Sequence, residues 1–166
     1  MTEVSNIRGG GGGSHGSRIC NPGYNYPLFK QCDYRWGNDV MDSETICYAG
    51  CLMTSITMAL NGRGKSSMNP GQMNYWLRSN NGYTDDLFEW YSVYSLGLRY
   101  VGFTTDIQTI IEWVCSGKVV VLNVRGGKHW VLAKSYSNGM FQVNDPGYNS
   151  NFYTSSQVVG ADALNA

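Results

Sequence analysis

The spacing of apolar residues changes once along this chain, near Lys118, and that change limits the folds open to it. Before Lys118 the apolar residues recur at helical intervals, most clearly between residues 105 and 116. After it, residues 119–124 form a short β-branched run that is typical of a buried strand. Helices followed by an antiparallel sheet predict the α+β class.

Four helices are predicted before this change, each with its own start signal or stop signal. They span residues 51–60, 70–79, 85–95 and 105–116. Asn69 and Pro70 supply a cap and a first-turn proline for the second helix. Thr84 can cap the third helix, and Thr105 with Gln108 has the capping-box pattern for the fourth.

A β-hairpin is predicted after the buried strand. Gly126-Gly127 turns the chain into a strand over residues 129–136. Asn138-Gly139 is a strong two-residue hairpin signal, and it leads into a strand over residues 140–144. At 166 residues the chain is expected to form a single domain, over residues 19–166, that is long enough to bury a core. The sequence has no internal repeat.

The N-terminal tail is a low-complexity segment. Residues 1–18 include five consecutive glycines, Gly9 to Gly13. Such a segment cannot pack and is expected to be a flexible coil. The folded part is expected to begin near Cys20, with residues 20–46 wrapping irregularly around the first helix.

Composition narrows the classes of partner. The formal net charge is zero and only 14% of residues are charged, so no basic stripe indicates a nucleic-acid partner. No stretch approaches the ~18 to 20 apolar residues of a membrane span. Residues 1–8 lack the apolar segment of a signal peptide. No cofactor or metal is expected, and the oligomeric state is not predicted.

The chain has an odd number of cysteines, Cys20, Cys32, Cys47, Cys51 and Cys115. In an oxidising compartment four of them could pair and one would stay free, and Cys51 is the obvious candidate for the free thiol. The alternative is a cytosolic protein with five reduced thiols. The first reading implies a secreted or extracellular protein, and the second a cytoplasmic one.

Cys51 has the surroundings of a nucleophile. Small residues and Gly50 precede it, and an apolar, helix-compatible stretch follows it. A cysteine in the first turn of a helix meets free backbone N–H groups and the positive end of the helix dipole, which favour the thiolate. The alternative is a buried small hydrophobic residue or half of a disulfide.

His129 and Asp145 are the predicted partners of this thiol. His129 opens a strand directly after a turn, where an imidazole can project toward a cleft. In a hairpin turned at Asn138-Gly139, the two residues are expected to lie nearly opposite each other across the ladder. Such a pair would fix the tautomer of the imidazole. The alternative is that Asp145 only bonds the backbone of its own turn.

Gln31 is the predicted oxyanion donor. Its side-chain amide would act together with the backbone N–H of Cys51 at the start of the helix. A glutamine in an irregular segment is otherwise usually a surface residue, so this role depends on the other three residues.

Several ordered blocks of the sequence resemble one family. They occupy residues 27–37, 45–55, 69–77, 127–132 and 143–147. The block Ala49-Gly50-Cys51-Leu52-Met53-Thr54-Ser55 is among them. Together they resemble papain-like peptidases of the bacteriocin-leader-processing, double-glycine type, and more specifically its stand-alone peptidase-like branch.

That resemblance implies a papain-like α+β fold, with a helical part that carries the cysteine and a C-terminal antiparallel sheet that carries His129 and Asp145. It implies Cys51 as nucleophile, His129 as base, Asp145 as orienting residue and Gln31 in the oxyanion hole. It implies no particular substrate.

A thiol hydrolase that cleaves peptide or isopeptide bonds is therefore the leading hypothesis, with a peptide or protein as substrate. A peptidoglycan amidase or endopeptidase would use the same residues, as would a transglutaminase-like enzyme or a deamidase. From another class, a non-catalytic binding module on a papain-like scaffold is the alternative.

Overall fold

The structure, a computed structural model, describes residues 18–166. The predicted flexible tail lies outside the described residues apart from Arg18. The carbonyl of Arg18 accepts a hydrogen bond from the Asn138 amide, and its guanidinium pairs with Glu112. Arg18 therefore lies against the domain. No helix within residues 18–166 is long and apolar enough to cross a membrane.

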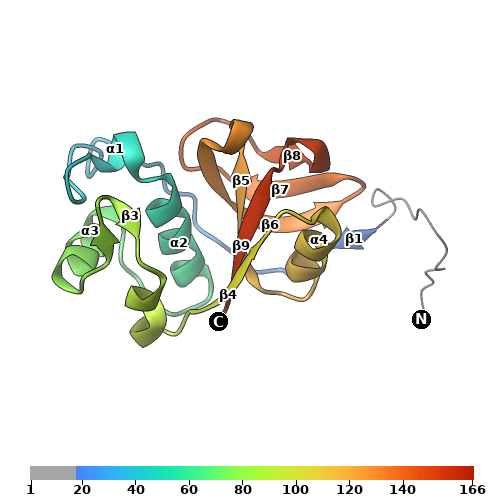
Figure 1. The fold of residues 1–166 in the computed structure, drawn as a ribbon, viewed down its shortest axis with the longest axis horizontal. Coiled ribbons are helices and arrows are strands. Elements are labelled where there is room, and N and C mark those ends of the chain that lie inside the picture. Colours follow the sequence, from blue (N-terminus) through green and yellow to red (C-terminus); the bar gives the residue numbers. More distant parts are fainter. Residues whose placement is uncertain (1–17) are drawn as a thin grey trace.

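The helices up to residue 96 form one part, and the sheet with one later helix packed on it forms a second part beside the first (Figure 1). The helical part contains α1 (Ile46–Ala49), α2 (Cys51–Gly62), α3 (Pro70–Ser79), a small hairpin of β2 (Tyr83–Thr84) and β3 (Leu87–Phe88), and the 3-10 helix η2 (Trp90–Leu96). Of these helices, α2 lies against the sheet, where it contacts β5 and β6. The predicted α+β class is confirmed.

The described residues form one seven-stranded antiparallel sheet. Its order is β4–β9–β5–β6–β7–β8, and β1 also pairs with β6. The strands are β1 (Ile19–Cys20), β4 (Arg99–Thr104), β5 (Val119–Val124), β6 (His129–Ser137), β7 (Met140–Asn144), β8 (Phe152–Thr154) and β9 (Gly160–Asn165). The short 3-10 helices η3 (Arg125–Gly127) and η4 (Ser155–Gln157) join strands.

The middle of the sheet is buried on both faces, which gives the molecule two apolar cores. Helix α2 covers one face, and α4 (Ile107–Cys115) covers the other. Strand β5 is buried throughout because its alternate side chains serve both cores. Val119 and Val121 pack with α2, whereas Val120 and Leu122 pack with α4. This explains why the strand reads as a continuous apolar run.

The helices with strong local signals form as predicted. Helix α2 begins at Cys51, and α3 begins at Pro70 with a complete capping box between Asn69 and Gln72. The fourth helix begins slightly later than predicted, because Asp106 rather than Thr105 caps it. The Asp106 carboxylate accepts a hydrogen bond from the Thr109 amide.

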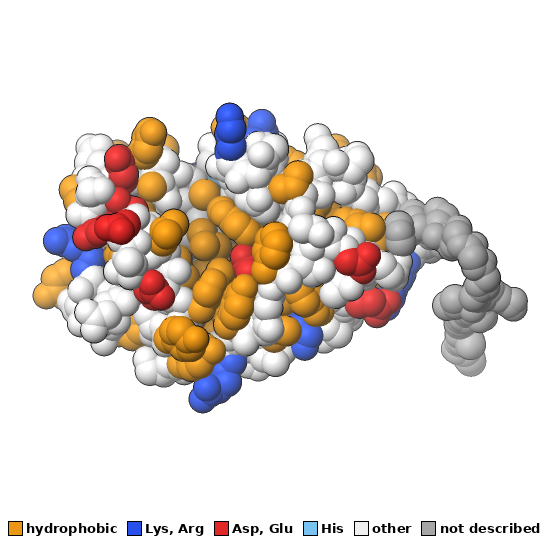
Figure 2. All heavy atoms as spheres, in the orientation of Figure 1, with side chains coloured by type: hydrophobic (Ala, Val, Ile, Leu, Met, Phe, Trp, Pro, Cys, Tyr) orange, Lys and Arg blue, Asp and Glu red, His pale blue; other side chains and the backbone are white. Residues whose placement is uncertain are grey.

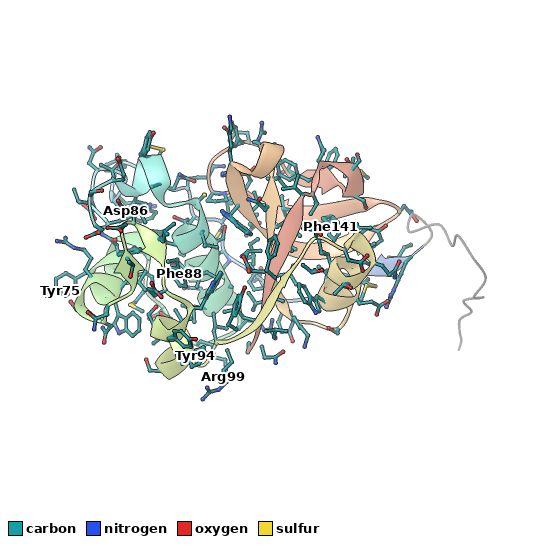
Figure 3. All side chains as sticks on the ribbon, viewed as in Figure 1. Tyr75, Asp86, Phe88, Tyr94, Arg99 and Phe141 are labelled. Atoms are coloured by element: carbon teal, nitrogen blue, oxygen red, sulfur yellow. A yellow bond between two sulfur atoms is a disulfide. The ribbon has the colours of Figure 1, made fainter. Side chains whose placement is uncertain are left out.

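The predicted helix over residues 85–95 is wrong. Residues 83–88 form the β2–β3 hairpin, and only η2 after it is helical. Asp85 and Asp86 both adopt left-handed backbone angles, with φ of 52° and 65°, which no α-helix accommodates. The Asp86 carboxylate holds this turn by accepting hydrogen bonds from the backbone amides of residues 42–44 (Figure 3).

Four strands of the sheet were not predicted: β1, β4, β8 and β9. Of these, β4 and β9 pair with each other, and β9 also pairs with β5. A register shift between Tyr100 and Gly102 interrupts the alternation of β4. Strand β9 contains a buried aspartate, Asp162, which obscures its apolar pattern. Figure 2 shows apolar side chains gathered over this part of the surface, where Phe103 and Val101 are exposed.

The cysteines pair as expected for an oxidising environment. Cys20 is bonded to Cys115, which joins β1 to the end of α4. Cys32 is bonded to Cys47, which joins the segment after Gln31 to α1. Cys51 is the cysteine that stays free within residues 18–166, as predicted.

Candidate active site

Cys51 is the first residue of α2 and follows a sharp break between two helices. Gly50 ends α1 and precedes α2, and its amide donates to the Ile46 carbonyl. A Cβ atom on Gly50 would lie only 2.5 Å from that carbonyl oxygen, so the break requires glycine. No side chain caps the start of α2. The half-buried thiol therefore lies at the uncapped, positive end of a twelve-residue helix.

The His129 imidazole lies between this thiol and a carboxylate. Its Nε2 is 2.6 Å from Oδ1 of Asp145, and it also forms a hydrogen bond with the Cys51 side chain. Because Nε2 forms the hydrogen bond with Asp145, Nδ1 is the ring nitrogen that can form the hydrogen bond with the thiol. His129 is only 6% exposed, and the ring of Tyr148 packs edge-on against it at 5.0 Å between centroids.

The predicted side-chain contact between His129 and Asp145 forms, but the two residues are not a cross-strand pair of the ladder. The β6–β7 ladder pairs Leu132 with Asn144 after a register shift between Ala133 and Ser135, and it ends there. The same register extended outward would bring residue 147 opposite His129. Asp145 instead follows the strand, and its side chain reaches the imidazole from the turn.

The Asp145 carboxylate is held by four hydrogen bonds. Its Oδ1 accepts from His129 and from the amides of Gly147 and Tyr148, each amide at 2.9 Å. Its Oδ2 accepts from the Tyr153 hydroxyl at 2.6 Å. The two interpretations of this residue, a turn aspartate and a partner of His129, are therefore both right. The turn folds tightly around the carboxylate, and this allows Asp145 to accept from the backbone amides of its own turn and from His129 at the same time.

These contacts determine the charges of the pair. Burial would raise the pKa of Asp145, but hydrogen bonds from His129, Tyr153 and the two amides hold that pKa below its usual value. Burial would likewise lower the pKa of His129, but its hydrogen bonds to Asp145 and Cys51 raise it to about 9. The resting site therefore favours a carboxylate beside an imidazolium.

Gln31 lies beside the start of α2, anchored at both ends. Its Nε2 donates to the Cys47 carbonyl at 2.9 Å, and its backbone amide donates to the Pro146 carbonyl at 2.9 Å. A second contact of Nε2, to the Ile46 carbonyl, is long at 3.5 Å. The buried Oε1 has no hydrogen-bond partner among the described residues. The amide oxygen is thus a free acceptor within residues 18–166, whereas the amide nitrogen has one short and one long hydrogen bond.

Lys30 and Gly147 connect the glutamine segment to the turn of Asp145. The Lys30 ammonium donates to the carbonyls of Asp145 and Tyr148, at 2.8 and 2.7 Å. A Cβ atom on Gly147 would lie 2.7 Å from the His129 ring and 3.1 Å from Oε1 of Gln31. The turn therefore passes directly over both side chains, and it can do so only with glycine at this position.

The structure brings together all four residues predicted for the site. Sequence reasoning missed the residues that support them, which are Lys30, Arg125, Gly147, Tyr148 and Tyr153. The Asp-Pro-Gly turn signal could have indicated Gly147, but no local signal marks the other four. Within residues 18–166 no cluster of three or more His, Cys, Asp or Glu side chains could hold a metal ion.

Comparisons with known proteins identify the family and the fold of this chain. The sequence model of the Peptidase_C39 like family matches residues 24–159. No curated protein sequence matches the chain at a significant level. A solved structure with the same fold is a double glycine motif protease from an AMS/PCAT transporter, in complex with the leader peptide. Its TM-score is 0.58 at 13% sequence identity, and the match covers 88% of this chain and 96% of that one. Because the family match spans most of the chain, this protein belongs to the Peptidase C39-like family of papain-like cysteine peptidases.

Proposed function

We propose that this protein hydrolyses peptide bonds with Cys51 as nucleophile, His129 as base and acid, Asp145 as orienting carboxylate and Gln31 as oxyanion donor. One observation carries the proposal. The His129 imidazole is bonded on one side to Asp145 and on the other to the free thiol at the start of α2.

The resting pair supplies the nucleophile. With its pKa raised to about 9, the His129 imidazole is protonated at neutral pH and can later act as the acid. The uncapped helix end stabilises a negative charge on the Cys51 sulfur and so favours attack by the thiolate. Asp145 accepts from Nε2 and so directs Nδ1 at the sulfur.

The thiolate then attacks the carbonyl carbon of the scissile bond. The developing oxyanion would accept hydrogen bonds from the Cys51 amide and from Nε2 of Gln31. The anchor of Nε2 on the Cys47 carbonyl supports this role, because it holds the amide close to the helix start and commits only one of its two hydrogens to a short bond.

The bond breaks when His129 gives its proton from Nδ1 to the leaving nitrogen. The acyl group remains on Cys51 as a thioester. A water molecule then attacks the thioester and passes a proton to His129. The acid product leaves, and the thiolate and imidazolium are restored.

A glycine-rich peptide is the first substrate class to test. The solved neighbour is a double glycine motif protease that holds a leader peptide, and this supports a peptide substrate here. The tail of this chain offers such a sequence itself, in Gly9 to Gly13.

An oxidising location is the second part of the proposal. Disulfides persist in secreted and extracellular proteins and are rare in the cytosol. The pairs Cys20–Cys115 and Cys32–Cys47 support a secreted or extracellular protein.

The test compares the protein with its Cys51→Ala variant on a Gly-Gly peptide and on purified peptidoglycan, with mass spectrometry of the products. We expect new peptide termini with the unchanged protein and none with Cys51→Ala. Release of stem peptides from peptidoglycan alone would favour the wall-hydrolase alternative. Equal cleavage by Cys51→Ala would exclude the proposed nucleophile.

A further inference from the structure

The proposed mechanism uses only one oxygen of Asp145. The other oxygen, Oδ2, accepts a hydrogen bond from the Tyr153 hydroxyl at 2.6 Å. Tyr153 lies on β8 and is 3% exposed, so this bond is shielded from water. A shielded hydrogen bond to a carboxylate is stronger than an exposed one.

The Tyr153 hydroxyl is itself held by Arg125. The Nε of Arg125 donates to this hydroxyl at 3.0 Å, and another guanidinium nitrogen donates to Ser150 at 3.2 Å. Arginine can only donate hydrogen bonds. The tyrosine oxygen therefore acts as an acceptor toward Arg125, and its single hydrogen is directed to Asp145.

Arg125 also contacts Tyr148, the aromatic residue that packs against the imidazole. Its guanidinium lies over the face of Tyr148, 3.6 Å from the ring centroid. The same Tyr148 ring packs edge-on against His129. One cation thus supports both the carboxylate behind His129 and the aromatic ring beside it.

The backbone of Arg125 indicates that this placement is specific. Its φ is 54°, in the left-handed region that residues other than glycine seldom adopt. Such a conformation persists only where the surroundings hold it, and it is found preferentially at functional sites. Arg125 begins η3, the short connection that leads from β5 into His129 at the start of β6.

We propose that Tyr153 and Arg125 are positioning residues that hold the Asp145 carboxylate, and through it the His129 imidazole, in line with Cys51. The direction of donation runs from Arg125 to Tyr153, and from Tyr153 to Asp145. This inference rests on the proposed function, since it concerns the same thiol, imidazole and carboxylate.

Alkylation of Cys51 by iodoacetamide tests the inference without knowledge of the substrate. Cys51 is the free cysteine of residues 18–166, so the native protein reports this thiol alone. In Tyr153→Phe the carboxylate loses one donor, and its protonation then occurs at a higher pH. We expect the rate of Cys51 alkylation to begin its fall toward acid at a higher pH in this variant. On a peptide that the unchanged protein cleaves, kcat should fall about tenfold with KM unchanged.

Two further variants separate positioning from folding. Arg125→Asn tolerates the left-handed backbone but removes the guanidinium that donates to the Tyr153 hydroxyl, so it should behave like Tyr153→Phe. Arg125→Lys keeps a donor and should recover part of the rate. Tyr136→Phe is the matched control, because this buried tyrosine of β6 accepts from the Gly139 amide away from the site. It should lower stability and leave the pH profile unchanged.

An unshifted profile and unchanged kcat in Tyr153→Phe would overturn the inference, as would the same shift in Tyr136→Phe. The proposed function is judged separately, by Cys51→Ala. If Cys51→Ala is inactive and Tyr153→Phe is normal, the mechanism stands and only the positioning role is lost.

Discussion

At the scale of single residues, the charge state of His129 decides what the site can do. The imidazole has a carboxylate on one side and a thiol on the other, and both favour its protonated form. An ordinary histidine, with a pKa near 6.5, would be largely neutral at pH 8. Here the pKa is raised to about 9, so the proton needed by the leaving group stays in place.

The first prediction concerns that proton. Because His129 acts as an acid only while protonated, kcat/KM should fall as the pH rises through about 9. In Asp145→Asn the negative partner is lost, so the imidazole should lose its proton at a lower pH, and the fall should occur there. The His129 resonance can be followed by NMR in a His15→Gln background, since the chain has two histidines.

An NMR titration of His129 with its midpoint near pH 6.5 in the unchanged protein would contradict this account of the site. A midpoint that does not move in Asp145→Asn would show that the carboxylate does not control the imidazole.

At the scale of elements, local signals decided helices α2 and α3 and the β6–β7 hairpin, but not the β2–β3 hairpin. Helices α2 and α3 form where predicted, because the residues that start and stop each helix lie within a few positions of the helix end that they set. The β2–β3 hairpin was missed because Asp86 is held by backbone amides of residues 42–44, more than forty positions away. No short window of the sequence contains both partners.

The second prediction concerns the break between α1 and α2. In Gly50→Ala the new Cβ would meet the Ile46 carbonyl oxygen at 2.5 Å and the Ile46 side chain at 2.8 Å. The start of α2 must shift, so we expect a loss of about 2 kcal/mol in the free energy of unfolding and slower alkylation of Cys51. Urea denaturation and iodoacetamide labelling measure the two effects.

Gly71→Ala is the control for this prediction. Its Cβ would meet nothing closer than 3.2 Å, and it lies in α3, where alanine is the better helix former. If both alanine variants lose stability equally, the crowding at Gly50 is not the cause.

At the scale of the whole molecule, the site lies where the helical part meets the sheet. Cys51 comes from α2, whereas His129 and Asp145 belong to β6 and the turn after β7. The segment of Gln31 crosses between them, tied to the helices through the Cys47 carbonyl and to the turn through the Pro146 carbonyl. Packing of α2 on the sheet therefore assembles the site.

The third prediction compares the two disulfides. Cys20–Cys115 joins residues 95 positions apart and Cys32–Cys47 joins residues 15 apart. By loop-closure entropy the longer loop should contribute about 4.7 kcal/mol and the shorter about 3 kcal/mol. Unfolding of the two double-serine variants should show this order.

Activity should show the opposite order. The shorter disulfide holds Gln31 next to α1, so its removal should lower kcat in the protein that stays folded. The longer disulfide lies at β1 and α4, away from the site residues, and its removal should leave kcat unchanged. Equal losses of kcat would mean that global stability, not the position of Gln31, governs the rate.

The sequence by itself determined the α+β class, the helix that begins at Cys51, the hairpin that follows His129 and the identity of the free thiol. These follow from short-range patterns of caps, turns, periodicity and cysteine number. Only the tertiary structure decided how Asp145 reaches His129 and where Gln31 is anchored. It also decided that Arg125 donates to Tyr153 and that Tyr153 donates to the Asp145 carboxylate. These contacts join residues far apart in sequence, and their geometry depends on strand register and on packing between the two parts.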